Sequence, residues 1–148
     1  MSLPPCTASG DLPPGIHRAT LAEVLERFGR SSSQRMLVGL RLERVYNVAS
    51  ATGHLARCVV FGSFVTAKPL PNDVDVFLLM EDTFDMAQLT GEARLLFEHA
   101  AAQTRFGASV FWLRRLAVLE DEQTTISYWQ ITREGYQRGI VEIIPELP

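Results

Sequence analysis

The chain has 148 residues, of which 47% are hydrophobic, a size and composition typical of one domain with a single sizeable core. Its formal net charge of −3 argues against stable binding to a polynucleotide, because such binding depends on a cationic face that neutralises many phosphates. Two cysteines without metal-ligand spacing favour the reducing cytoplasm, and the lack of a long apolar run argues against secretion and membrane insertion.

The N-terminal segment differs in composition from the rest of the chain. Residues 1–15 are rich in proline and glycine, which resist regular structure, so they are expected to form an extended arm. Residues 16–148 are expected to form a single domain.

Two helices are predicted directly after the arm. Thr20 and Glu23 match a capping box, and apolar residues then recur at helical spacing until Gly29. The serines at positions 31–33 offer a second N-cap, and the apolar stripe that follows ends near Gly53. The second helix should therefore be the longer one.

Two short apolar segments predict buried strands. Residues 57–61 and 74–80 are rich in β-branched and aromatic side chains, and Gly62 closes the first of them. Prolines in the intervening segment forbid a long helix but leave room for one turn at residues 63–66.

The remaining elements complete a mixed pattern. Residues 86–100 predict a helix, or a loop and a helix, and residues 109–113 predict a third strand. Residues 126–131 and 139–144 are expected to be the two strands of a hairpin. The order of elements predicts an α/β (α+β) domain, a mixed β-sheet with helices packed on one face.

A pair of aspartates carries the clearest chemical signal. Asp73 and Asp75 are two residues apart at the start of a predicted strand, so both carboxylates should project from one face, roughly 6.5 to 7 Å apart along the chain. Unpaired carboxylates beside an apolar strand are costly. Mg²⁺ (or Mn²⁺), a hard ion that prefers carboxylate and phosphate oxygens, would relieve that cost.

A turn beside the aspartates suits an anion. Gly62 ends the preceding strand and Ser63 begins a turn, which would direct backbone N–H groups and a hydroxyl at a phosphate. A phosphate-binding turn next to a metal-binding strand is the arrangement required for phosphoryl or nucleotidyl transfer.

Gly62-Ser63 at the end of one strand, followed about ten residues later by Asp73-x-Asp75 on the next, resembles the signature of the DNA polymerase β-like nucleotidyltransferases, including the minimal bacterial ones. The resemblance implies that Gly62 and Ser63 bind the triphosphate of a nucleoside triphosphate such as ATP, and that Asp73 and Asp75 bind Mg²⁺. It also implies possible protein partners, because minimal prokaryotic relatives often act in toxin–antitoxin pairs.

A broader likeness, to a poorly characterised prokaryotic branch of this superfamily, extends over most of the chain. It rests on three blocks of sequence: Leu12-Pro13-Pro14-Gly15-Ile16-His17, Gly62-Ser63-Phe64-Val65-Thr66, and Arg133-Glu134-Gly135 followed by Gly139-Ile140-Val141.

Two departures from the superfamily pattern bear on activity. Many relatives have a glycine where this chain has Thr66, so the turn must be built differently. Relatives also supply a third carboxylate from a later strand, but the expected strand offers only Ser109 as a polar side chain. The residues that could substitute are Glu142, Glu120, Asp121 and Glu122, and spacing does not choose among them.

Other polar and aromatic residues are weaker candidates. Lys68 could reach a nucleotide phosphate from the loop between the two motifs, although most loop lysines are only solvated. Arg133 and Arg138 flank a predicted turn and could either contact phosphate or face water, with water slightly favoured. The pair Tyr128-Trp129 is expected to fill the core rather than to form a base-stacking platform. The three histidines are too scattered in sequence to form a ligand pair.

Two functions are consistent with these residues. The first is Mg-dependent transfer of a nucleoside monophosphate from a nucleoside triphosphate to a hydroxyl of a small molecule or protein. The alternative, favoured by the missing third carboxylate, is a non-catalytic module of the same fold that binds a nucleotide or a partner protein.

Overall fold

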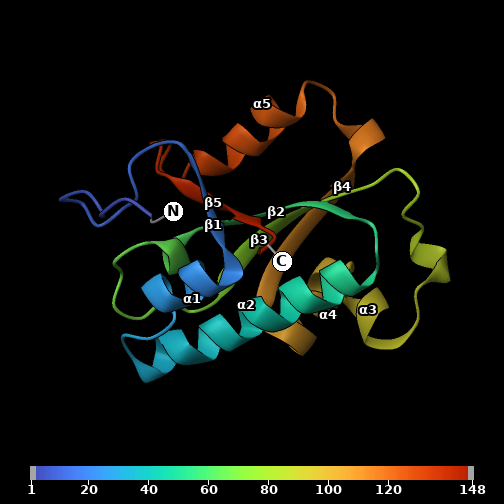
Figure 1. The fold of residues 1–148 in the computed structure, drawn as a ribbon, viewed down its shortest axis with the longest axis horizontal. Helices are drawn as coiled ribbons and strands as arrows, with labels where there is room; N and C mark the ends of the chain where they lie inside the picture. The colour runs from blue at the N-terminus through green and yellow to red at the C-terminus, as the bar shows by residue number, and fades with distance from the viewer. Residues whose placement is uncertain (1–2, 147–148) are drawn as a thin grey trace.

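The computed structural model describes residues 3–146, which form a mixed β-sheet covered by helices (Figure 1). The helices are α1 (Leu21–Phe28), α2 (Ser33–Ala51), α3 (Gly91–Leu96), α4 (His99–Phe106) and α5 (Glu122–Ser127). The strands are β1 (Ile16–Thr20), β2 (Leu55–Phe61), β3 (Val74–Met80), β4 (Ala108–Arg114) and β5 (Ile140–Ile144). Short 3-10 helices are η1 (Ser63–Val65), η2 (Met86–Gln88), η3 (Arg115–Ala117) and η4 (Tyr128–Gln130).

The sheet has five strands in the order β1-β5-β2-β3-β4. β1 is parallel to β5 and β3 is parallel to β4, whereas β2 is antiparallel to both of its neighbours. The prediction of an α+β domain with a mixed sheet is confirmed. β3 occupies the position between β2 and β4, so residues at its N-terminal end can meet groups from two other strands.

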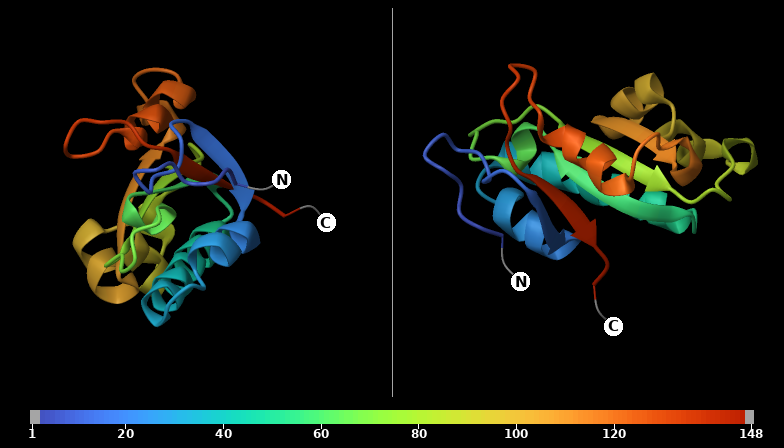
Figure 2. Two further views of the ribbon diagram at one scale, coloured as in Figure 1. Left: turned by 90° about the vertical axis from the view of Figure 1, so that its left-hand side faces the viewer. Right: turned by 90° about the horizontal axis from the view of Figure 1, so that it is seen from above.

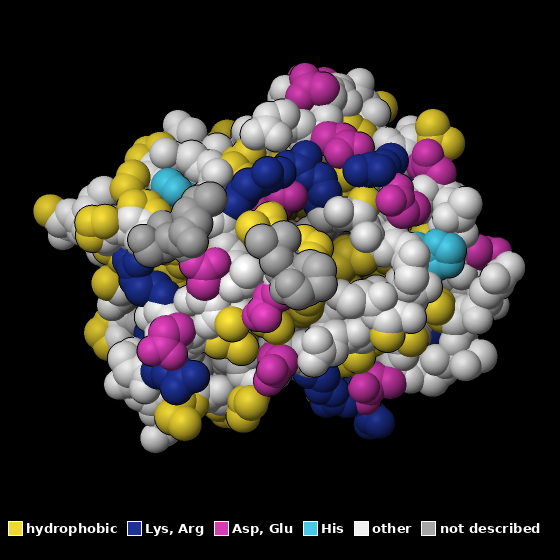
Figure 3. Space-filling view, viewed as in Figure 1, with side chains coloured by type: hydrophobic (Ala, Val, Ile, Leu, Met, Phe, Trp, Pro, Cys, Tyr) yellow, Lys and Arg dark blue, Asp and Glu magenta, His cyan; other side chains and the backbone are white. Residues whose placement is uncertain are grey.

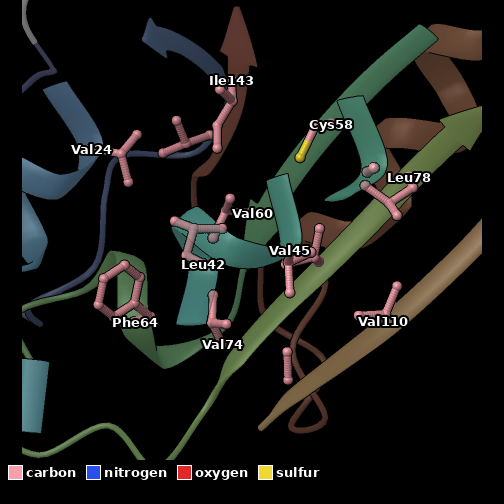
Figure 4. Packing of buried hydrophobic residues seen from close by; sticks show 14 of the residues in the cluster. Val24, Leu42, Val45, Cys58, Val60, Phe64, Val74, Leu78, Val110 and Ile143 are labelled. Atoms are coloured by element: carbon pink, nitrogen blue, oxygen red, sulfur yellow. The ribbon is translucent and has the colours of Figure 1, made fainter. Parts of the chain in front are cut away.

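The two faces of the sheet are covered differently (Figure 2). Helices α1 to α4 pack on one face, where their apolar side chains and those of the strands form the main core; Figure 4 shows Leu42, Val60, Phe64 and Val74 meeting there. A smaller cluster on the other face joins Phe77 of β3 to Ile126 of α5. Helices were expected on one face, and α5 is an addition on the second.

The helix boundaries follow the capping residues. Thr20 accepts a hydrogen bond from the Glu23 N–H while the Glu23 carboxylate accepts one from the Thr20 N–H, which is the predicted capping box at the start of α1. Ser32 caps α2 in the same way through the N–H of Arg35. Both predicted helices are therefore confirmed.

The first strand of the predicted C-terminal hairpin is wrong, although its turn at Glu134-Gly135 is present, with one antiparallel bridge between Ile131 and Gln137. Residues 126–131 lie in α5 and η4 rather than in a strand, because Asp121 caps a helix through the N–H of Thr124 and Ile126 then packs on the sheet. β5 is present as expected, but it pairs with β1 and β2. β1 itself was not predicted.

The N-terminal arm packs onto the domain. Leu12 is buried in the main core, and its carbonyl accepts a hydrogen bond from the N–H of Gly139. Arg27 of α1 donates to the carbonyls of Leu3 and Pro4. The described part of the arm, residues 3–15, thus covers α1 and the segment that leads into β5.

The segment predicted as one helix, or a loop and a helix, over residues 86–100 is divided. η2 is followed by α3, which begins at Gly91, and by α4, which extends to Phe106. Within residues 3–146 there is no helix of the length and apolarity that a membrane span requires.

Candidate functional site

The candidate site forms where the C-terminal end of β2 meets the N-terminal ends of β3 and β4. Phe61 of β2 and Ser109 of β4 are both in register with Asp75. Gly62 follows directly, with a positive φ of 81°. A Cβ at this position would overlap with the Asp75 carboxylate, so the close approach of backbone and carboxylate requires glycine.

Ser109 connects the two aspartates. Its Oγ donates a hydrogen bond to Asp73 Oδ2 at 3.2 Å and accepts one from Gln103 Nε2 at 3.3 Å. Asp73 lies just before β3 and Asp75 is its second residue, so both carboxylates lie beside the same β4 side chain. The structure therefore brings Asp73, Asp75 and Gly62 together.

The environment of the Asp75 carboxylate disfavours its ionised form. Burial, together with the negative charge of Asp73, raises its pKa from 3.8 to about 6. The positive charges of Arg133 and Arg138, together with the nearby Ser109 hydroxyl, act in the opposite direction. The free energy of the ionised site would fall if a further cation bound between the two carboxylates.

Arg133 and Arg138 contribute positive charge to this environment, and of the two only Arg133 faces water as expected. Both lie close enough to Asp75 to lower its pKa. Arg138 is half-buried and forms an ion pair with Asp11 at 3.6 Å, whereas Arg133 is exposed. The loop between η4 and β5 thus supplies two positive charges that act on Asp75.

The turn after Gly62 is closed by Thr66, where relatives of the resembled superfamily have glycine. The Thr66 N–H and Oγ1 both donate to the carbonyl of Ser63, at 3.2 and 2.6 Å. Thr66 Oγ1 also accepts from the N–H of Lys68. The Ser63 hydroxyl has no hydrogen-bond partner within residues 3–146, and it is therefore available to a ligand.

A buried arginine, which sequence reasoning missed, holds this turn. Arg35 of α2 is only 4% exposed and donates to the carbonyls of Phe28, Phe64, Thr66 and Lys68. Burial lowers its pKa, and the four carbonyl acceptors take the place of a carboxylate partner. Arg35 fixes the path of the chain directly after Ser63.

Lys68 is in the turn but is not fixed at the carboxylates. Its side chain is exposed and makes no hydrogen bond or ion pair within the described residues. Its backbone is held by Thr66 and Arg35. The candidate phosphate contact from Lys68 stays a prediction, and it requires the side chain to move to the ligand.

Glu142, one of the four candidates for a third carboxylate, is paired with arginine elsewhere. It is 4% exposed on β5 and accepts two hydrogen bonds from Arg57, at 2.7 and 2.8 Å. Burial acts to raise its pKa, but the hydrogen bonds and charge of Arg57, with a contribution from Arg18, lower it overall. Glu142 neutralises buried arginine rather than joining Asp73 and Asp75.

The other carboxylate candidates are also placed away from the aspartate pair. Asp121 caps α5, Glu122 pairs with Arg57 and Arg115, and Glu120 is exposed in the preceding loop. Within residues 3–146 no group of three or more His, Cys, Asp or Glu side chains is arranged to hold a metal ion. A bound metal would therefore need oxygens from its ligand in addition to those of the protein.

The donor set nevertheless fits Mg²⁺. It consists of two carboxylates and a serine hydroxyl, which are hard oxygen ligands, and it carries a repulsion that a divalent ion would remove. Mg²⁺ usually binds through one or two carboxylates together with water and substrate phosphates. Asp73 and Asp75 would be its protein ligands.

Neither cysteine contributes a nucleophile to this site. Burial, with the nearby charge of Glu142, raises the pKa of the Cys58 thiol to about 12, so it is not ionised near neutral pH. Cys6 lies in the N-terminal arm beside Arg27. The three histidines bond to separate partners, Pro13, Thr83 and Val110, as their spacing predicted.

Basic and acidic side chains lie next to one another on the face seen in Figure 3. There, basic side chains form a short row with acidic side chains on both sides of it. The ion pairs of Arg57 and Arg115 with Glu122, and of Arg115 with Glu81, are of this kind. Such a row neutralises itself and does not form a broad cationic surface.

The fold and the site together define an α+β protein with a mixed five-stranded sheet and a pair of aspartates where three strands meet. The chain belongs to a family of unknown function, DUF6932, which matches over residues 4–144. No curated protein and no solved structure matched the chain.

Proposed function

We propose that this protein binds a nucleoside triphosphate with Mg²⁺ and transfers the nucleoside monophosphate to a hydroxyl of a small molecule or protein. The observation that carries the proposal is the close approach of the Gly62 turn to the Asp75 carboxylate. Asp73 lies beside this contact and accepts a hydrogen bond from the Ser109 hydroxyl. One ligand that carries both phosphate and Mg²⁺ would satisfy the turn and the aspartates together.

The groups around Asp75 support a triphosphate as that ligand. Ser63 offers an unpartnered hydroxyl, and Arg133 and Arg138 contribute positive charge on the loop before β5. A triphosphate carries several negative charges in a row, so it can contact the metal, the turn and an arginine at the same time. The resemblance to polymerase β-like nucleotidyltransferases agrees with this distribution of donors.

In the proposed reaction, a hydroxyl oxygen of the acceptor forms a bond to the α-phosphorus, the bond to the β-phosphate oxygen breaks, and pyrophosphate leaves. Mg²⁺, when bound, would neutralise charge on the phosphates and lower the pKa of the attacking hydroxyl. Asp73 and Asp75 would position the α-phosphate, and the hydroxyl proton would leave to solvent. Ser63 and the arginines would hold the departing phosphates.

A second candidate function is nucleotide binding without turnover. The observation that favours it is Ser109, which is in register with Asp75 on the strand where the resembled superfamily has its third carboxylate. A hydroxyl neither accepts a proton near neutral pH nor binds a second metal ion strongly, and general-base help typically contributes a factor of about 10² to 10⁴. This candidate predicts binding comparable to that of an enzyme, with little transfer.

Pyrophosphate release distinguishes the two candidates. Purified protein is incubated with each of ATP, CTP, GTP and UTP, with Mg²⁺, Mn²⁺ or chelator, and with a panel of hydroxyl-bearing acceptors. Metal-dependent release that is lost in Asp75→Asn supports transfer. Metal-dependent binding without release supports the non-catalytic module, and the absence of both contradicts the proposed function.

A further inference from the structure

An aromatic cavity lies at the β4 edge of the sheet, next to α5 and η4, and its volume of about 470 Å³ is within the usual range for small-molecule sites. Its aromatic wall consists of Phe77, Phe97, Phe111, Trp112, Tyr128 and Trp129. Two of these rings are continuous with the candidate site: Phe77 follows Asp75 by two residues on β3, and Phe111 follows Ser109 by two on β4. The cavity therefore begins roughly 7 Å along the strands from the carboxylates.

Trp129 lies among several of these rings. Its ring centroid is 4.6 Å from that of Phe61, 5.2 Å from Phe77 and 5.1 Å from Phe111. These contacts arise because η4 lies over β2, β3 and β4. Tyr128 is 59% exposed, so the expectation that both Tyr128 and Trp129 fill the core is wrong for Tyr128. Rings at such spacing contact one another and hold Trp129 in place, so the ring surface free to stack on a planar ligand is that of Phe111, which is 38% exposed, and of Tyr128.

Two polar groups accompany the aromatic wall. The indole N–H of Trp129 is buried and meets no acceptor within residues 3–146, and a ligand reaches this donor only when the indole shifts toward the cavity. His99 lies at the rim and donates from Nδ1 to the carbonyl of Val110 at 3.2 Å, so Nε2 of the neutral ring is an acceptor. A donor and an acceptor beside stacked rings match the edge of a heteroaromatic ring.

We infer that this cavity binds a planar heteroaromatic ring of a substrate whose reacting group lies at Asp73 and Asp75. The position of the reacting group rests on the proposed function, whereas the ring-binding site is inferred from the residues that line the cavity. The ring belongs either to the nucleobase of the nucleotide or to an aromatic acceptor that carries the hydroxyl. Both sources share the chemistry that the cavity recognises.

Intrinsic fluorescence measures occupancy directly, because the two tryptophans of the chain, Trp112 and Trp129, both line the cavity. The protein is titrated with adenosine, guanosine, cytidine and uridine, and separately with pyridoxine and 5-hydroxyindole. Saturable binding of a nucleoside assigns the cavity to the nucleobase, and saturable binding of the hydroxylated rings alone assigns it to the acceptor. Absence of saturable binding by all six probes overturns the inference.

Two variants tie the binding to the cavity. Phe111→Leu keeps an apolar side chain at a partly exposed position and should weaken ring binding at least about fivefold, because loss of one base–aromatic stack typically costs this much or more. Tyr46→Leu changes a half-buried aromatic residue that does not line the cavity and should leave binding unchanged. Equal loss in both variants would contradict the assignment.

A third variant tests the indole donor. Trp129→Phe keeps a stacking ring but removes the N–H, and it should weaken binding about two- to tenfold, as expected for one neutral hydrogen bond. Trp112 remains as the fluorescent reporter. Unchanged affinity would show that the Trp129 N–H is not a recognition group and would remove the polar part of the inference.

Inorganic triphosphate separates this inference from the proposed function, since it carries the phosphates and binds Mg²⁺ but has no ring. Calorimetric binding of Mg²⁺-triphosphate without any ring binding would support the carboxylate site and overturn the ring site. Ring binding without binding of Mg²⁺-triphosphate would support the ring site and contradict the carboxylate site.

Discussion

Replacement of Asp75 by asparagine should stabilise the protein in the absence of metal. In the folded protein the pKa of Asp75 is about 6, and its ordinary value is 3.8. Each factor of ten in proton affinity corresponds to about 1.4 kcal/mol, so the ionised carboxylate destabilises the fold by at most about 3 kcal/mol. Allowing for screening by solvent, we expect Asp75→Asn to increase the free energy of unfolding at neutral pH by about 1 to 3 kcal/mol.

The pH dependence of stability tests independently whether the ionised Asp75 carboxylate destabilises the fold. The folded state binds the Asp75 proton more tightly than the unfolded state, so this contribution to stability is fully present below about pH 4 and is lost as the pH rises through about 6. Asp75→Asn and the unaltered protein should therefore differ little near pH 4 and most above pH 6. Urea unfolding across this range, followed by circular dichroism, measures the difference.

A matched control is Glu120→Gln, which removes a carboxylate from an exposed loop and should change the free energy of unfolding by less than about 0.5 kcal/mol. Added Mg²⁺ and nucleotide should stabilise the unaltered protein but not Asp75→Asn. A variant that is less stable than the unaltered protein at neutral pH would refute the reasoning. Such a result would show that Asp75 contributes structural hydrogen bonds.

Three further substitutions test other parts of the account by urea unfolding and calorimetry. Gly62→Ala should destabilise by about 1 to 3 kcal/mol more than Gly53→Ala, because both glycines have positive φ but only Gly62 touches the neighbouring carboxylate. Ser109→Asp should lower stability without metal and raise affinity for Mg²⁺, whereas Ser109→Asn should do neither. Glu142→Gln should destabilise by up to about 3 kcal/mol by leaving Arg57 partly unpaired, with Mg²⁺ affinity unchanged.

Each of these has a clear contrary outcome. Equal losses for the two glycine variants would mean that backbone conformation alone, without the close approach to Asp75, explains Gly62. No gain in Mg²⁺ affinity for Ser109→Asp would show that Ser109 does not face the metal ligands. Loss of metal binding in Glu142→Gln, with the fold intact, would make Glu142 the missing third carboxylate.

Much of the candidate site follows from local sequence. The two-residue period of a strand is enough to predict that Asp73 and Asp75 lie on one side, and the apolar strand of residues 109–113 is enough to bring Ser109 beside them. The turn at residues 63–66 follows from the prolines after it, and η1 occupies it. These features depend on short segments whose patterns are clear.

The elements that sequence reasoning missed depend on distant contacts. β1 is stabilised by parallel pairing with β5, more than a hundred residues later, and α5 replaces a predicted strand because Ile126 packs on Phe77 and its neighbours. The aromatic cavity depends on the position of η4 over the sheet, so the sequence could suggest a stacking role for Tyr128 and Trp129 but could not favour it over core packing. Tertiary packing overrode strand propensity in this segment.

Arg35 shows a signal that sequence alone contained. The predicted stripe on α2 began at Val38 and continued through Leu42, and one step of three residues toward the N-terminus reaches Arg35. An arginine on the buried stripe of a helix needs several acceptors, and the carbonyls of the turn after Ser63 supply them. The same reasoning would have connected α2 to the candidate site.

The central claim, that Asp73 and Asp75 bind a metal–nucleotide complex, is tested most directly by calorimetric titration of the unaltered protein and Asp73→Asn with ATP, CTP, GTP and UTP, each with and without Mg²⁺. The account predicts that at least one nucleotide binds only when Mg²⁺ is present and that Asp73→Asn abolishes this dependence while the fold is retained. Nucleotide binding that is the same without Mg²⁺ and in Asp73→Asn, or no binding at all, would contradict it.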